Sequence, residues 1–369
     1  MTSTDELKYW IGFSRIHGIG RVRISQLKNY FGNLEAAWSA TEVQLKQAGL
    51  DSKSIDAFLS LKSEVHPDSE LERLEHYKIT ALACDDPGYP HRLLEIYDYP
   101  PVLYLRGNPL SEEEAYLAVV GTRRPSIYGR QVAEEIVRDL AQCRTTVVSG
   151  LARGIDSIAH RSTLDVQGKT VAVLASGLDT VYPPENKELA RAIMQQGTLV
   201  SEYPPGIRPK PENFPMRNRI MSGLSLGVLV VEAGQKSGAL ITALQALEQN
   251  REVFAIPGSI LSPTSKGTNH LIQQGAKLVC NCNDILEELK LSVAAPHQLS
   301  ITETLASDGN EAAILRLLSA EPVHIDDICR LSELNMAEVS STLAMLELKG
   351  AARQIGNLKY SLAQEMRSK

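Results

Sequence analysis

Short apolar runs rich in valine recur between residues 117 and 280, and segments of helix length separate them. The runs are continuous rather than alternating, as expected for strands that are covered on both faces. Strands that alternate with helices predict an α/β domain with a Rossmann-like, doubly wound and mostly parallel sheet. The runs that we assign to strands are 117–120, 145–148, 170–175, 198–200, 227–231, 252–256 and 277–280.

Residues 1–78 show helical periodicity and predict a separate all-helical domain. Within it, Gly18 and Gly20 form a Gly-x-Gly turn that is followed by Arg21 and Arg23. This pattern is typical of a helix-hairpin-helix, in which the glycines let the backbone approach a phosphate. A packing hairpin in a small helical (SAM-like) domain explains the turn equally well. We predict one extended Rossmann-like domain over residues 79–290.

The C-terminal part of the chain predicts a winged helix. Residues 291–310 are polar and indicate a linker, and three short amphipathic segments and a strand-turn-strand pattern follow within 311–369. Residues 301–369 contain seven basic and ten acidic residues, a net charge of −3. Because helices that read DNA usually carry arginine and lysine, we expect this domain to contact protein or to bind DNA only weakly.

Charge and composition narrow the function classes. The chain has 369 residues and a net charge of −6, which argues against a protein that holds nucleic acid by bulk charge. The longest apolar stretch, near 227–231, is far below the roughly 18 residues of a membrane span, so we expect a cytoplasmic protein with no membrane contact. Five scattered cysteines lack zinc spacing, and we expect no metal.

Small or charged residues follow almost every predicted strand directly, as in 121–124, 149–154, 201–206 and 232–239. In open α/β sheets, ligands bind beyond the carboxyl ends of the strands, where backbone amides and helix N-termini favour phosphate. We therefore expect these turns to build one site for a polyanion. Arg123 is its first candidate, because it directly follows a strand in a Gly-Thr-Arg turn.

A second group of basic residues lies just before and within a predicted helix. Arg217 and Arg219 are two positions apart and face different ways on a helix, so one of them can be structural. Phe214 can stack on a nucleobase or act as a hydrophobic staple at the helix start, and both interpretations stay open. The basic residues of this group are Arg208, Lys210, Arg217 and Arg219.

The sequence contains few motifs that are typical of enzymes. It lacks a P-loop, a Gly-x-Gly-x-x-Gly turn that opens a helix after a strand, and a nucleophile elbow, so we expect no cofactor. Asp156 and His160 are four residues apart, and we interpret them as a capping or packing pair. Glu232 is the most enzyme-like carboxylate, yet no partner base is evident.

Six motifs occur in one order between residues 86 and 280 and together closely resemble the DNA-processing protein A (DprA/Smf) family of bacteria. The flanking helical and winged-helix domains also resemble accessory domains of this family. The motifs are Gly121-Thr-Arg123, Ser149-Gly-Leu-Ala-Arg-Gly-Ile-Asp156, Tyr182-Pro-Pro-Glu-Asn186, Phe214-Pro-Met-Arg-Asn-Arg-Ile220, Ser237-Gly-Ala-Leu-Ile-Thr242, and Pro257-Gly258 with Lys266-Gly-Thr-Asn269.

The resemblance implies a homodimeric protein that is not an enzyme and that binds single-stranded DNA, and double-stranded DNA more weakly. It implies that the protein protects incoming DNA and loads the RecA recombinase on it in natural transformation and recombination. Arg123 would hold phosphate, Phe214 would contact a base, and Lys210 would supply charge nearby. The DNA-binding residues carried over are Gly121, Thr122, Arg123, Gly150, Arg153, Gly154, Lys210, Phe214, Arg217, Asn218, Arg219, Ser237 and Gly238.

An enzyme that acts on a nucleotide is the alternative. The predicted fold resembles that of cytokinin-activating phosphoribohydrolases, which carry a Pro-Gly-Gly-x-Gly-Thr phosphate turn followed by a catalytic glutamate. The corresponding stretch here reads Glu232-Ala-Gly-Gln-Lys-Ser-Gly-Ala239 and lacks that turn. The sequence therefore favours a binding protein over an enzyme.

Overall fold

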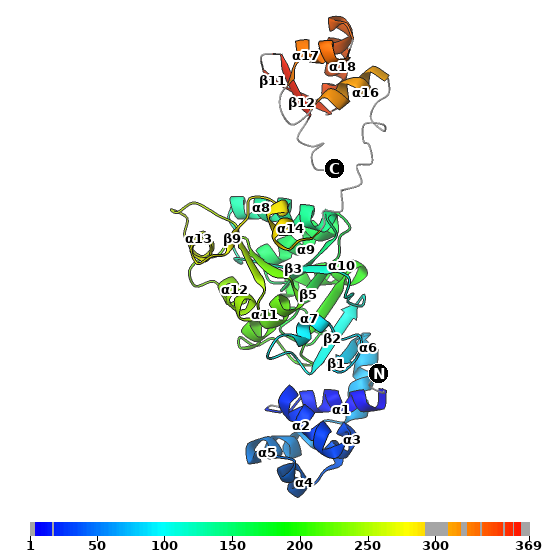
Figure 1. Ribbon diagram of the computed structural model, residues 1–369. Coiled ribbons are helices and arrows are strands. Elements are labelled where there is room, and N and C mark those ends of the chain that lie inside the picture. Colours follow the sequence, from blue (N-terminus) through cyan, green and yellow to red (C-terminus); the bar gives the residue numbers. More distant parts are fainter. Residues whose placement is uncertain are drawn as a thin grey trace. The chain divides into compact units, whose positions relative to one another are not determined.

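A computed structural model describes residues 4–16, 18–291, 309–318, 323–332, 334–349, 351–356 and 358–362 (Figure 1). The chain divides into two compact units, Met1–Ala294 and Ala295–Lys369. Most of the predicted linker, residues 292–308, lies outside the described residues. Within the described part, no helix has both the length and the apolarity that crossing a membrane would require.

Aromatic side chains hold the N-terminal helices together. Phe13, Trp38 and Phe58 are buried and pack on one another with ring centroids 5.1–5.5 Å apart. Thr41 and Asp51 cap two of the helices by accepting hydrogen bonds from backbone N–H groups of the first turn. The helices are α1 (Thr4–Ser14), α2 (Arg21–Phe31), α3 (Leu34–Ser39), α4 (Glu42–Gln47), α5 (Ser52–Lys62) and α6 (Pro67–Tyr77).

The two arginines that follow the glycine turn between α1 and α2 contact protein groups. The guanidinium of Arg21 lies over the rings of Tyr97 and Tyr99, 5.2 and 4.6 Å from their centroids. Arg23 forms an ion pair with Asp51 at the start of α5. Both arginines therefore contact groups of the protein itself, which is what we expect if the glycine turn has a packing role.

The sheet confirms the predicted mostly parallel, doubly wound fold. Its strand order is β1-β2-β6-β5-β4-β3-β7-β8-β9; β3 to β9 run parallel, and β1 and β2 add an antiparallel edge beside β6. The strands are β1 (Thr80–Ala83), β2 (Val102–Gly107), β3 (Ala115–Val120), β4 (Thr145–Ser149), β5 (Thr170–Val173), β6 (Thr198–Ser201), β7 (Gly227–Val230), β8 (Glu252–Ala255) and β9 (Lys277–Leu278).

Helices cover both faces of this sheet, which explains its continuous apolar strands. One face packs on α8 (Ile127–Gln142), α9 (Ile155–Asp165), α10 (Lys187–Gln196) and α14 (Cys282–Glu288). The other face packs on α7 (His91–Leu94), α11 (Asn213–Leu224) and α12 (Gly238–Glu248). The helix α13 (Lys266–Gln273) and the short 3-10 helix η1 (Pro184–Asn186) complete the described helices of this unit.

The chain reverses its direction of winding at β3. From β3 the chain winds through β4 and β5 to β6 on one side, and after α11 it returns to place β7 on the other side of β3. The turns that follow the adjacent strands β3 and β7 therefore lead away from each other. Such a switch point is where open α/β sheets bind their ligands.

The second unit is the predicted winged helix. Its three-stranded sheet has the order β10-β12-β11 and packs with three helices around a core that contains Ile314, Ile328, Leu343 and Leu346. The elements are α16 (Gly309–Leu317), β10 (Val323–His324), α17 (Ile325–Ser332), α18 (Met336–Leu348), β11 (Ala352–Gly356) and β12 (Lys359–Leu362).

Candidate nucleic-acid interface

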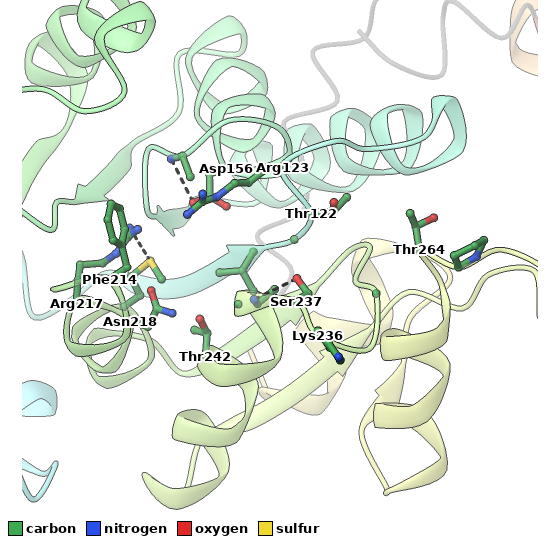
Figure 2. A pocket seen from close by; sticks show the side chains of 18 residues that line it. Thr122, Arg123, Asp156, Phe214, Arg217, Asn218, Lys236, Ser237, Thr242 and Thr264 are labelled. Atoms are coloured by element: carbon green, nitrogen blue, oxygen red, sulfur yellow. Dashed lines mark hydrogen bonds between the residues drawn. The ribbon is translucent and has the colours of Figure 1, made fainter. Parts of the chain in front are cut away.

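A cavity of about 560 Å³ opens at the switch point, beyond the carboxyl ends of β3 and β7 (Figure 2). The turn after β3, one side of α11, the start of α12 and the 263–264 segment form its walls. Eight of the residues predicted from the sequence line this cavity. They are Gly121, Thr122, Arg123, Phe214, Arg217, Asn218, Ser237 and Gly238.

The other five predicted residues lie elsewhere. Gly150 and Arg153 line a smaller cavity that also contacts Arg123 and Phe214, so the two cavities share a border. Gly154, Lys210 and Arg219 line neither cavity, and Lys210 is exposed ahead of α11.

Backbone contacts fix the turn that carries Arg123. The Thr122 N–H donates to the Glu232 carbonyl over 2.7 Å, and the Ile155 N–H donates to the Thr122 carbonyl over 3.2 Å. Gly154 has a φ of 78°, and a Cβ atom there would lie 2.3 Å from the Thr122 oxygen. Gly154 therefore acts beneath the turn, where only a glycine fits.

Arg217 places a buried charge in the cavity wall. Its side chain is enclosed, and its Nη1 donates to the Val173 carbonyl over 2.7 Å. A Cβ atom at Gly150 would lie 1.7 Å from that nitrogen, so the glycine makes room for the guanidinium. Burial lowers the pKa of Arg217 to about 10, which leaves it charged at neutral pH.

Asp156 faces Arg217 from the start of α9 and shares the same cavity. Burial raises the pKa of the Asp156 carboxyl group, and the charge of Arg217 opposes that rise. Its Oδ2 accepts hydrogen bonds from the N–H groups of Gly150 and Ala152, at 3.1 and 3.4 Å. Asp156 therefore holds the turn after β4 in place beside the arginine.

Arg123 and Lys236 are the exposed cations of the cavity. The Arg123 guanidinium lies 5.8 Å from the centroid of the Phe214 ring, a cation–π geometry. Within the described part of the chain, neither Arg123 nor Lys236 has a side-chain hydrogen bond or an ion pair. Both charges are therefore available to an anionic ligand.

The start of α12 supplies further polar groups. The Ser237 hydroxyl accepts a hydrogen bond from the Ala239 N–H over 3.3 Å, and Gly238 leaves the first turn open, since a Cβ there would meet nothing within 4 Å. Asn218 and Thr242, which are 9% and 1% exposed, also line the cavity, and their side chains have no hydrogen-bond partner among the described residues. Buried polar groups without partners suit a ligand with donors and acceptors.

Arg219 has a structural position. It is buried on another side of α11, where it forms ion pairs with Glu202 and, over 3.2 Å, with Asp98. Residues two positions apart on a helix point in directions about 200° apart, so Arg219 and Arg217 lie on different sides of α11. Arg153 is ion-paired too, with Glu185 at the protein surface.

The candidate catalytic groups are engaged in the fold. The Glu232 Oε2 accepts a hydrogen bond from the Ser126 N–H over 2.8 Å, and its Oε1 accepts one from the Thr264 hydroxyl over 2.5 Å. The carboxylate thereby ties the start of α8 to a loop that lines the cavity. The His160 Nδ1 lies 2.7 Å from the Thr170 hydroxyl oxygen. Among the described residues, no cluster of histidine, cysteine and acidic side chains can hold a metal.

Lys236, Thr242 and Thr264 are among the cavity residues that the sequence-based selection missed. Lys236 and Thr242 lie within stretches that drew attention through their glycines, so their motifs gave a usable signal. Thr264 lies in a loop with no recognisable pattern, and its hydrogen bond to the distant Glu232 helps to hold it at the site.

The fold defines a Rossmann-like protein with a cavity at the switch point that is lined by the exposed cations Arg123 and Lys236. Residues 80–290 match the family model described as DNA recombination-mediator protein A, and residues 284–356 match the model of the DprA winged helix domain. The protein Smf of Synechocystis sp. is 35% identical, over 97% of this chain and 99% of that relative. The chain therefore belongs to the DNA recombination-mediator protein A (DprA/Smf) family.

Two of the solved structures that are similar to this one are structures of DNA processing protein A. The X-ray structure of DNA processing protein A from Streptococcus pneumoniae has a TM-score of 0.67 and 37% identity, and the match covers 78% of this chain and 99% of that chain. A structure of DNA processing protein A from Helicobacter pylori, described as giving insight into its single-stranded DNA binding mode, has a TM-score of 0.53 and 30% identity. That match covers 58% of this chain and 97% of that chain.

His160 makes stability depend on pH. Burial lowers the pKa of His160 to about 3, whereas an unfolded chain has a histidine pKa near about 6.5. Between these values the unfolded state binds more protons, so stability is present above about pH 6.5 and is lost as the pH falls toward 3.

We predict that between pH 7 and pH 5 the free energy of unfolding falls more steeply in the wild type than in His160→Gln. One proton is worth up to about 1.4 kcal/mol per pH unit. Urea unfolding at a series of pH values measures both slopes. Asp156 is present in both proteins, so its titration does not enter the difference, and equal slopes would contradict the prediction.

Proposed function

We propose that this chain binds single-stranded DNA at the cavity rim, with double-stranded DNA bound more weakly. The observation that carries the proposal is the convergence of two unpaired cations, Arg123 and Lys236, with the Phe214 ring and the open start of α12. The similarity to the Helicobacter pylori protein, whose structure concerns single-stranded DNA binding, supports the same ligand class.

In this proposal, different residues of the site contact the phosphates and the bases of the strand. Arg123, Lys236 and the N–H groups at the start of α12 face the phosphates, because each offers positive charge or a donor. Phe214 offers a ring face to an unpaired base, while Asn218 and Thr242 offer hydrogen-bonding groups from the cavity lining. A duplex hides its base faces by stacking and pairing, so it can use the phosphate contacts alone.

We infer that the protein acts as a cytoplasmic homodimer that protects incoming DNA and loads RecA on it in natural transformation and recombination. Family membership supports this role. We also infer that the chain is not an enzyme, since Glu232 is bound on both oxygens and lacks a partner base among the described residues. Release of free base from nucleoside monophosphates by the purified protein would instead favour the phosphoribohydrolase alternative.

Arg123→Ala tests the binding site. We expect affinity for a thymidylate oligonucleotide to fall by about tenfold or more, because a charge-assisted contact contributes about 1.5–3 kcal/mol. The dependence of log affinity on log salt should lose about 0.7, the value for one phosphate contact on a single strand. Fluorescence anisotropy at several salt concentrations measures both quantities.

Arg124→Ala is the matched control, because Arg124 is the next residue, is exposed, and lines neither cavity. It should keep the wild-type affinity within about twofold. Unchanged affinity in Arg123→Ala, or equal losses in the two variants, would remove the support for this site.

Removal of residues 300–369 tests the winged helix. The exposed side chains of α18 include Met336, Glu338, Met345 and Glu347, and none of its residues is basic. We therefore expect the shortened protein to keep its affinity for single-stranded DNA while its RecA loading falls. Strand-exchange assays with RecA, run beside the anisotropy titration, separate these roles. A large loss of DNA affinity would show that the winged helix binds DNA.

A further inference from the structure

We propose that Tyr182 is a second stacking platform, which binds the base next to the one that contacts Phe214. This inference rests on the proposed binding of single-stranded DNA and extends it to a second nucleotide subsite. Tyr182 lies in the segment before η1, far in sequence from the turns that form the main cavity.

The two aromatic rings form one continuous surface. The centroids of Tyr182 and Phe214 are 5.9 Å apart, and the ring planes are inclined by 61°. Both rings line the smaller cavity, and Phe214 with Arg123 also borders the larger one. A strand that leaves the larger cavity across Phe214 therefore reaches Tyr182 next.

Tyr182 is available to a ligand. The residue is 46% exposed, although its ring also contacts Phe214 in an edge-to-face arrangement. A half-exposed aromatic ring beside a basic cavity is the arrangement on which single strands stack their bases. Because the two rings are inclined, two bases cannot stay stacked on each other while each lies flat on its own ring. The subsite therefore selects an unstacked strand.

The charges beside Tyr182 favour a base over a phosphate. Arg153, which lines the smaller cavity, forms an ion pair with Glu185, so its charge is largely balanced. Arg123, which also borders the larger cavity, is the unpaired cation of that lining among the described residues. Loss of the Tyr182 ring should therefore weaken binding without removing a phosphate contact.

Substitutions at Tyr182 test the proposal in the full-length protein. A stacked base contributes about 1–3 kcal/mol, so we expect Tyr182→Ala to weaken binding of a thymidylate hexamer by about tenfold. Tyr182→Phe should bind within about twofold of the wild type. Tyr182→Leu, which fills the space without an aromatic ring, should lose about as much affinity as the alanine variant.

The salt dependence and an abasic hexamer separate stacking from a structural role. The slope of log affinity against log salt should stay unchanged in Tyr182→Ala, in contrast to Arg123→Ala. An abasic hexamer with the same phosphates should bind equally well to wild type and Tyr182→Ala. Equal losses on both hexamers would show that the ring only supports the cavity and would overturn the proposal.

The outcomes also distinguish this inference from the proposed function. If Arg123→Ala weakens binding and Tyr182→Ala or Tyr182→Leu does not, the second subsite is wrong while the DNA-binding site stands. If no variant changes affinity for the hexamer, the proposed function itself fails at this cavity.

Discussion

The close contact between Gly154 and the carbonyl of Thr122 is the constraint on which the site depends. It lets the start of α9 press against the turn after β3, while the Glu232 carbonyl holds the same turn from the β7 side. A side chain at position 154 would need both a strained φ and the space of the Thr122 oxygen. The fold therefore fixes the backbone of Arg123 and leaves its side chain free to meet a ligand.

The buried charge of Arg217, in the same region, lowers the stability of the fold. Arg217 is enclosed, and its Nε has no hydrogen-bond partner among the described residues. Such burial is unfavourable, and the Val173 carbonyl and the nearby Asp156 offset only part of it. In the proposed function, this charge adds to the positive potential of the cavity, where the dielectric constant is lower than at the protein surface. Gly150 is the residue that makes this placement sterically possible.

The sequence predicted the sheet well because its buried strands are continuous apolar runs, and five of the eight predicted cavity residues lie in turns that follow β3 and β7, which end at one edge of the sheet. The other three, Phe214, Arg217 and Asn218, lie in α11 and were predicted from the basic stretch and from the resemblance to the family. It did not decide between Arg217 and Arg219, since the partners of Arg219, Glu202 and Asp98, approach only in the folded chain. Thr264 could not be predicted for the same reason, since it reaches the site through contacts of the folded chain such as its hydrogen bond to Glu232, 32 positions away.

In the proposed function, a net charge of −6 changes how the site must select its ligand. Bulk attraction to nucleic acid is weak in such a protein, so affinity has to come from contacts within the cavity. Phosphate contacts alone are the same for single and double strands, whereas ring faces such as those of Phe214 and Tyr182 serve only bases that have left a stack. The acidic character of the chain therefore strengthens the preference for unpaired strands, because it weakens the long-range attraction, which is the same for single and double strands.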